Sequence, residues 1–338
     1  ARDLVLRIRE TRGEQTGVDS LMQEYALSTQ EGVVLMCLAE SLLRVPDAAT
    51  ADKLIKDKIG SGNWDSHKGQ SDSVFVNAST WALMLTCRVV KLDTTAGGDF
   101  EGILRRLVAR SGEPVIRQAV TYAMRILGQQ FVLGRNIDEA MKRAKPWRDK
   151  GYRFSFDMLG EAAYTAKDAR RYYKSYQEAL RAIASAAPDK ATSVFQRPSI
   201  SVKLSALHPR YEWVKRDRVM DELLPQLQAL AAEARELNIG ITLDAEEAER
   251  LDIMLDIFEA MGEDPRVKGW EGLGMVVQAY QKRALPVIAW LGDLARRQNR
   301  RIPIRLVKGA YWDTEVKRAQ ELGISDYPTF TRKPATDK

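Results

Sequence analysis

Short apolar runs with strand character alternate with helical segments five times between Gly151 and the end of the chain. Parallel strands need a crossover of a dozen or more residues between them, and that crossover is usually a helix. The alternation therefore predicts one parallel sheet covered by helices. The predicted strands are 152–156, 200–204, 239–243, 274–277 and 304–307, and the helices that follow them are 166–186, 218–237, 245–261, 284–297 and 314–322.

Two arrangements of such a sheet are open at this point. Five strands cannot close a barrel that needs eight, and the region after Gly151 is shorter than the roughly 250 residues usual for that fold. The sheet is either an open doubly wound sheet or part of a barrel. We favour a distorted (βα)8 TIM-like barrel that is truncated after about five βα units.

The first part of the chain reads as entirely helical. Apolar residues recur at helical spacing in 33–43, 51–59, 74–92, 100–110, 114–127 and 137–145. We therefore divide the chain into a helical arm (1–70), a helical domain (71–150) and the barrel (151–338).

Composition limits the classes of function. The 338 residues carry a formal charge of +6, but basic residues are scattered among acidic ones, which favours solvated helix faces with a weak preference for phosphates or an anionic membrane surface. Aromatic residues are not interleaved with basic runs, so we predict no nucleic-acid partner within this chain. Cys37 and Cys87 form no metal cluster and fit a reducing, cytoplasmic compartment. No run reaches the ~18 apolar residues of a membrane helix.

Five polar residues lie at or just beyond the ends of successive predicted strands. In a barrel these strand ends meet at one mouth, where active sites are found. Cations, a carboxylate and an amide in one cleft are typical of an anion and cofactor site. Any one of them alone could equally be a solvated strand end. The five residues are Lys203, Asp244, Gln278, Arg305 and Lys308.

These residues belong to longer motifs that resemble a known family. The strings 201–211 (SVKLSALHPRY), 243–247 (LDAEE), 278–283 (QAYQKR) and 305–313 (RLVKGAYWD) are similar to the proline dehydrogenase domain of the bifunctional proline utilization A flavoenzymes. The string 30–40 (QEGVVLMCLAE) resembles the same family's dimerisation arm and helical domain. The resemblance covers essentially the whole chain.

The resemblance implies a non-covalently bound FAD that oxidises L-proline to Δ1-pyrroline-5-carboxylate by hydride transfer to flavin N5, with electrons passed to a membrane quinone. It implies that Lys203 pairs with the substrate carboxylate and that Asp244 orients groups around the amine. Tyr311 would pack against the proline ring. Glu161 would close the site by pairing with an arginine from the last barrel helix.

The resemblance also implies a set of flavin contacts. Arg305 would lie near the N5 edge, where a cation favours the anionic reduced flavin. Trp312 would pack against the cofactor. The implied cofactor-binding residues are Asp244, Gln278, Arg305, Lys308, Gly309, Ala310, Trp312, Thr331, Arg332 and Lys333, and no metal is expected.

The implied setting is a cytoplasmic homodimer that associates peripherally with the membrane when reduced, within a parent protein that carries an aldehyde dehydrogenase domain. The family's last three strands and final helix have no counterpart in the sequence. We therefore expect a polypeptide ending at Lys338 to bind FAD poorly and to turn over little. Two alternatives stay open: another FAD barrel oxidoreductase of the methylenetetrahydrofolate reductase kind, or a non-catalytic helical scaffold or dimerisation fragment.

Overall fold

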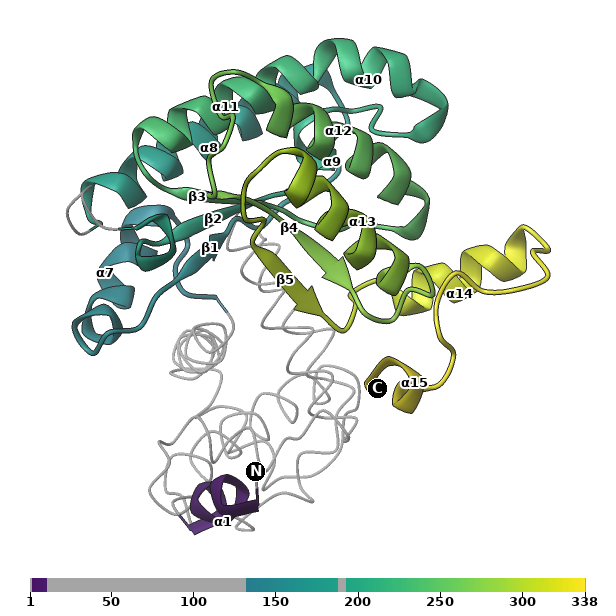
Figure 1. Ribbon diagram of the computed structural model, residues 1–338, viewed down its shortest axis with the longest axis horizontal. Helices are drawn as coiled ribbons and strands as arrows, with labels where there is room; N and C mark the ends of the chain where they lie inside the picture. Colours follow the sequence, from purple (N-terminus) through teal and green to yellow (C-terminus); the bar gives the residue numbers. More distant parts are fainter. Residues whose placement is uncertain (1, 11–131, 188–192, 338) are drawn as a thin grey trace, which may run out of the picture. The chain divides into compact units, whose positions relative to one another are not determined.

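The computed structural model describes residues 2–10, 132–187 and 193–337 (Figure 1). The chain divides into two compact units, Ala1–Asn136 and Ile137–Lys338. In the first unit the structure describes helix α1 (Arg2–Glu10). The helices predicted between residues 33 and 127, and the boundary predicted after residue 70, lie outside the described residues.

Helix α7 (Ile137–Asp149) opens the second unit, although the sequence analysis assigns it to the helical domain. The sequence predicts its end at Lys145, ahead of Pro146, but the helix continues through the proline for a further turn. A proline removes one helical hydrogen bond and crowds the preceding turn. Here the chain leaves the helix soon afterwards, at Gly151 with φ +89°, whose N–H donates to Arg148 O.

The second unit contains a five-stranded parallel sheet, as the sequence predicts. Its strands are β1 (Ser155–Asp157), β2 (Ser199–Val202), β3 (Gly240–Leu243), β4 (Leu273–Gln278) and β5 (Ile304–Val307). Each strand pairs in parallel with the next one along the chain, in the order β1-β2-β3-β4-β5. A doubly wound sheet reverses its strand order at a switch point. The sequential order therefore confirms an α/β fold of the barrel type.

The helices between the strands all lie on one side of the sheet (Figure 1). They are α8 (Ala166–Ser185), α9 (Leu204–Leu207), α10 (Arg216–Glu222), α11 (Leu224–Glu236), α12 (Leu251–Glu263) and α13 (Ala284–Arg297). A doubly wound sheet carries helices on both faces. The one-sided cover gives a second reason for a barrel. None of the described helices is both long and apolar enough to cross a membrane.

Alternation along the strands separates an apolar face from a polar one. Ile200, Val202, Ile241 and Leu243 are buried, and the register sets Ile200 beside Ile241 and Val202 beside Leu243. Each such side chain contributes about 1.5 to 3 kcal/mol relative to exposure. The residues between them, such as Ser201, point to the opposite face because successive side chains of a strand alternate. The helices cover the apolar face, which leaves the polar face for a site.

Two predicted helices differ from those observed. The helix predicted at 218–237 is interrupted at Leu223 and becomes α10 and α11, because Pro225 lies in the first turn of α11 and has no N–H to continue the preceding ladder. The helix predicted from Ala245 begins later, with a 3-10 turn η5 (Ala248–Arg250) ahead of α12. The delay leaves residues 244–247 as a loop at the end of β3.

Candidate active site

Two cations and two carboxylates meet on the polar face of the sheet. Lys203 Nζ lies 2.7 Å from Asp157 Oδ1 and 2.8 Å from Asp244 Oδ2. The Arg305 guanidinium pairs with Asp244 Oδ1, and its Nη1 donates to Ser201 Oγ at 2.7 Å. The five residues come from four strands or from the positions directly after them. We call these residues the ionic cluster.

The strand register explains why these side chains meet. Val202 pairs with Leu243, and the N–H of Asp244 donates to Val202 O, so Lys203 and Asp244 leave neighbouring strands at the same level. Arg305 is the second residue of β5 and not its last, and its long side chain spans the distance to Asp244. Of the five residues predicted to meet, the described contacts bring together Lys203, Asp244 and Arg305 but not Gln278 and Lys308.

Burial and charge act against each other in this cluster. Burial disfavours the ammonium of Lys203, but the carboxylates of Asp244 and Asp157 outweigh it and raise its pKa. Burial also raises the pKa of Asp244, whose side chain is 8% exposed, although Lys203 favours its charged form. A lysine ammonium has three donors, and the two described contacts engage two of them. Lys203 is therefore a charged anchor with capacity for a ligand carboxylate.

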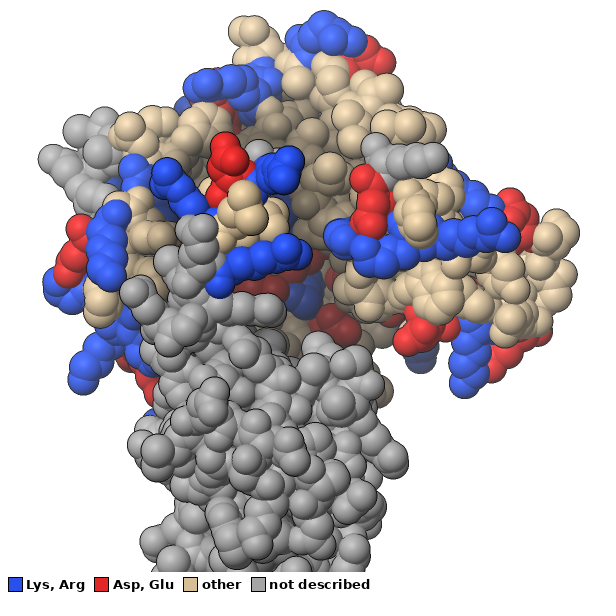
Figure 2. All heavy atoms as spheres, turned by 90° about the horizontal axis from the view of Figure 1, so that it is seen from below, with Lys and Arg blue, Asp and Glu red and all other residues tan. Residues whose placement is uncertain are grey.

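Figure 2 views the molecule from the uncovered side of the sheet and shows acidic and basic side chains close together around a hollow of the second unit. The ionic cluster itself contains two cations and two carboxylates. A mixed site of this kind suits a zwitterion, because it offers partners to both a carboxylate and an amine.

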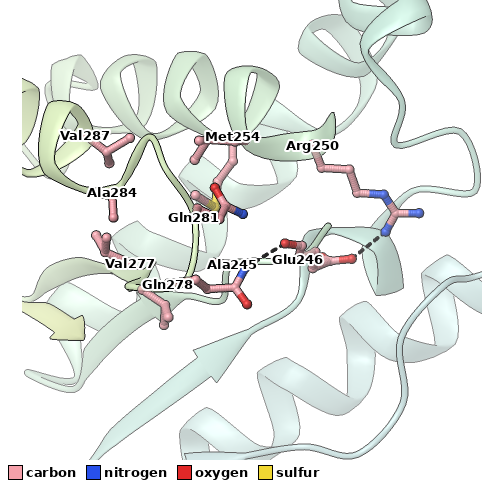
Figure 3. Close-up of a pocket in the computed structure, with 11 residues that line it drawn as sticks. Ala245, Glu246, Arg250, Met254, Val277, Gln278, Gln281, Ala284 and Val287 are labelled. Atoms are coloured by element: carbon pink, nitrogen blue, oxygen red, sulfur yellow. Dashed lines mark hydrogen bonds and ion pairs between the residues drawn. The ribbon is translucent and has the colours of Figure 1, made fainter. Parts of the chain in front are cut away.

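Gln278 lies at the end of β4 but outside the ionic cluster. Its side chain is buried, with Nε2 donating to Glu246 O at 2.8 Å and Oε1 accepting from Ala310 N at 3.1 Å. Figure 3 shows it directed toward Ala245 and Glu246, at the wall of a recess between α12, α13 and the sheet. Gln278 thus joins the loop after β3 to the loop after β5.

The loop after β5 rests directly on an aromatic ring. Gly309 has φ +143°, and a Cβ there would lie 2.4 Å from the ring of Tyr280. The N–H of Tyr280 donates to Lys308 O at 2.8 Å. The Lys308 side chain is mostly exposed and lies 2.9 Å from Asp337 Oδ1. Only glycine allows this close approach, so the loop has a fixed course.

The aromatic residues after this loop reach two further segments. Tyr311 Oη donates to Glu161 Oε2 at 3.3 Å, and burial followed by the Glu161 charge raises the pKa of the phenol. Trp312, the first residue of helix α14 (Trp312–Glu321), donates through Nε1 to Phe330 O at 2.9 Å. Tyr311 and Glu161 therefore lie together, and the hydrogen bond joins the loop after β5 to the loop after β1.

The remaining predicted cofactor residues lie at the end of the described chain. Thr331 and Arg332 are exposed, and Lys333 begins the short helix α15 (Lys333–Asp337). Lys333 Nζ lies 2.7 Å from Asp337 Oδ2, so Asp337 pairs with both Lys333 and Lys308. None of the interactions in the described part of the chain joins Thr331, Arg332 or Lys333 to the ionic cluster.

Sequence reasoning missed three contributors to the site. Asp157 ends β1 as the predicted residues end their strands, and Ser201 lies two residues before Lys203 on the same face of β2. Both could have been found from the strand period. Tyr176 of α8, whose Oη accepts from the N–H of Lys203 at 3.1 Å, carried no sequence signal because an aromatic residue on a helix usually belongs to the core.

Two family models match the chain. One, described as proline dehydrogenase, matches residues 140–338, which is more than half of the sequence. The chain belongs to the proline dehydrogenase family. The second model, described as the DNA-binding domain of proline dehydrogenase, matches residues 17–131, which lie outside the described residues. Its description names DNA binding, which the sequence analysis does not expect for this chain.

Curated relatives agree with this membership. The chain is 53% identical over 333 residues to the bifunctional protein PutA of Klebsiella aerogenes, covering 98% of this chain and 25% of that protein. It is 52% identical over 329 residues to PutA of Escherichia coli, covering 97% of this chain and 25% of that protein. Proline dehydrogenase 1 of Bacillus subtilis subsp. natto is 30% identical over 194 residues, covering 57% of this chain and 55% of that protein. The chain spans about a quarter of the length of the PutA relatives.

Solved structures agree as well. A crystal structure of a Bradyrhizobium japonicum proline utilization A variant matches 98% of this chain and 33% of that chain, with a TM-score of 0.66 and 47% identity. A structure of proline utilization A with proline bound in remote sites matches with the same TM-score and identity, and with the same coverage of both chains. The fold assignment from strand order therefore has independent support.

The residues of the site fit a flavin and a small amino acid. The donor set combines the Arg305 guanidinium and the Lys203 ammonium, which can stabilise negative charge on a reduced ring and on a carboxylate. On this face of the sheet, Ser201 of the cluster has Thr242 as its neighbour on β3 instead of a bulky apolar side chain. Arg305 and Lys203 are part-buried and remain accessible, with side chains 36% and 16% exposed.

Proposed function

We propose that the chain is the catalytic part of an FAD-dependent proline dehydrogenase that oxidises L-proline to Δ1-pyrroline-5-carboxylate as the first step of proline catabolism. The observation that carries the proposal is the ionic cluster, in which Lys203 and Asp244 offer one cation and one carboxylate at 2.8 Å from each other. Membership in the proline dehydrogenase family supports the same substrate. Bound FAD would supply the hydride acceptor, its N5 atom.

Substrate recognition follows from the charges of the cluster. Lys203 binds the carboxylate of proline as a point charge, and Asp244 accepts from the amine and orients it. A bound carboxylate replaces Asp157 at Lys203, because the Asp157 side chain is 47% exposed and returns readily to water. Tyr311 packs against the ring of proline. Glu161, which accepts a hydrogen bond from the Tyr311 hydroxyl, closes the site.

Flavin recognition uses the other half of the site. With FAD bound, Arg305 would lie near the N5 edge and would stabilise negative charge on the reduced ring, while Asp244 and Ser201 hold its guanidinium in place. Gln278 and Lys308 donate hydrogen bonds to the cofactor, and Trp312 packs on it. The cofactor is also bound by the Gly309–Ala310 backbone and by Thr331, Arg332 and Lys333.

The wider setting is also a proposal. Bound FAD would pass its electrons to a membrane quinone, which requires a peripheral membrane contact of the protein in the reduced state. The protein acts in the cytoplasm as a homodimer, and its parent chain carries an aldehyde dehydrogenase domain that consumes the product. The PutA relatives, of which this chain spans about a quarter, support the second catalytic domain of the parent chain through their description as bifunctional.

The test is anaerobic addition of L-proline to the intact protein that contains this chain, with the visible flavin absorbance as the readout. We expect bleaching of the flavin by proline and no bleaching by a nicotinamide donor. A protein of the methylenetetrahydrofolate reductase kind would give the reverse result, and a scaffold would carry no flavin. The K203M variant should keep its flavin but need far more proline, because it loses the carboxylate anchor.

A further inference from the structure

A buried carboxylate joins helix α14 to the loop that carries Asp244. Glu315 lies in the first turn of α14 and is 4% exposed. Its Oε1 accepts a hydrogen bond from the backbone N–H of Ala248 at 2.6 Å. Ala248 begins η5, four residues after Asp244. The contact spans 67 residues of sequence and connects the segments that follow β3 and β5.

Helix α14 makes its other described side-chain contacts to the rest of the unit from exposed residues, namely Trp312, Arg318 and Gln320. Its buried members are Glu315 and Ala319, and the rest of its side chains lie wholly or partly in solvent. A second link, between Arg318 and Glu249, involves side chains that are about half exposed. Exposed ion pairs of this kind contribute little. Among the described contacts of the helix, the Glu315 contact is therefore the buried polar anchor.

The anchor is coupled directly to the residues that the proposed function places at substrate and flavin. The N–H of Glu315 donates to Tyr311 O at 2.9 Å, which forms the first turn of α14. Tyr311 is the residue before the helix, and Trp312 is its first member. A change in how Glu315 sits against Ala248 therefore moves Tyr311 and Trp312 relative to Asp244.

We propose that Glu315 is a positioning residue for proline oxidation, and that its hydrogen bond to Ala248 sets the separation between Tyr311 and Asp244. This inference rests on the proposed function. Glu315 does not touch the substrate. It acts by holding the ring-packing residue and the amine-orienting residue at the separation that bound proline spans, so its loss weakens substrate binding.

The test compares E315A and E315Q with the matched variant E321A in the intact protein. Glu321 lies on the same helix, is exposed, and pairs only loosely with Lys317 at 3.7 Å. We expect E315A to raise the KM for proline by about tenfold with a much smaller change in kcat. E315Q keeps an oxygen acceptor for Ala248 and should stay within about twofold of wild type, as should E321A.

Hydrogen exchange supplies a readout that does not depend on proline. In E315A, exchange should accelerate in the peptides that cover residues 244–250 and 311–316, and it should not in E315Q or E321A. Accelerated exchange with an unchanged KM in E315A would overturn the inference, and so would unchanged exchange. A wild-type protein whose flavin is not reduced by proline would instead overturn the proposed function. Flavin reduction in wild type is therefore measured before the variants are compared.

Discussion

Replacing Lys203 with methionine tests how strongly the ionic cluster is held together. Methionine keeps most of the apolar stem and removes the ammonium. Asp244, which is 8% exposed, would lose one of its two cations, while Asp157, which is 47% exposed, would be rehydrated. Breaking a buried pair costs about 3 to 5 kcal/mol and breaking an exposed one about 0.2 to 1 kcal/mol.

The K203M variant falls between these limits, because Arg305 still pairs with Asp244. We expect the free energy of unfolding to fall by about 2 kcal/mol. For a unit of roughly 200 residues this lowers Tm by about 4 to 8 °C. The pKa of Lys203 is raised, so this contribution is complete at pH 7 and declines only as the pH rises beyond about 10, the ordinary lysine value.

The assay is thermal and urea unfolding of wild type, K203M, D244N and the double variant, with K282M as the matched control. Lys282 pairs with Asp326 at 2.6 Å, but that pair is exposed. K282M should therefore lose less than about 1 kcal/mol. The double variant should show a coupling energy of about 1 to 2 kcal/mol. A coupling near zero, or a K203M effect no larger than that of K282M, would refute the reasoning.

Two further predictions concern the frame of the site. G309A should displace the loop after β5, because its Cβ would lie 2.4 Å from the Tyr280 ring at a φ of +143°. We expect weaker FAD binding by G309A in a flavin titration. G292A is the control, because a Cβ at Gly292 would meet open space. T165A removes the capping box of α8, in which Thr165 Oγ1 accepts from Asp168 N, and should cost about 1 kcal/mol in urea unfolding. The hydrogen bond from Thr165 lowers the pKa of Asp168, so the contribution of Asp168 to folding stability is present above about pH 4 and is lost as the pH falls below it. A D168N variant whose stability fell with pH as steeply as that of wild type would contradict this assignment.

The sequence predicted the sheet well because its apolar runs are short and separated by helices. Its limits appear where a local exception matters. Pro225 interrupts a segment whose apolar spacing predicts one helix. Helix α12 begins later than predicted, because residues 244–247 form a loop after β3. Helical spacing of apolar residues continues across both breaks, so periodicity alone could not show them.

The site was predictable in its charged centre and less so at its edges. Lys203 and Asp244 meet because parallel strands deliver their carboxyl ends to one edge, and Arg305 reaches them from the second residue of β5 with its long side chain. Gln278 was expected at the same place but instead bridges two loops, since its amide is drawn to the backbone of Glu246 and Ala310. The hydrogen-bond partners of a residue such as Gln278 depend on strand stagger and on nearby backbone groups, which the sequence alone does not reveal.

The most direct test of the central claim is a crystal structure of the intact protein with FAD and a proline analogue bound. We predict that the Arg305 guanidinium lies at hydrogen-bond distance, about 2.7 to 3.2 Å, from the isoalloxazine ring. The carboxylate of the analogue should replace Asp157 as a partner of Lys203. A flavin bound away from Arg305, or a Lys203 that still pairs with Asp157 while the analogue carboxylate lies elsewhere, would contradict the account.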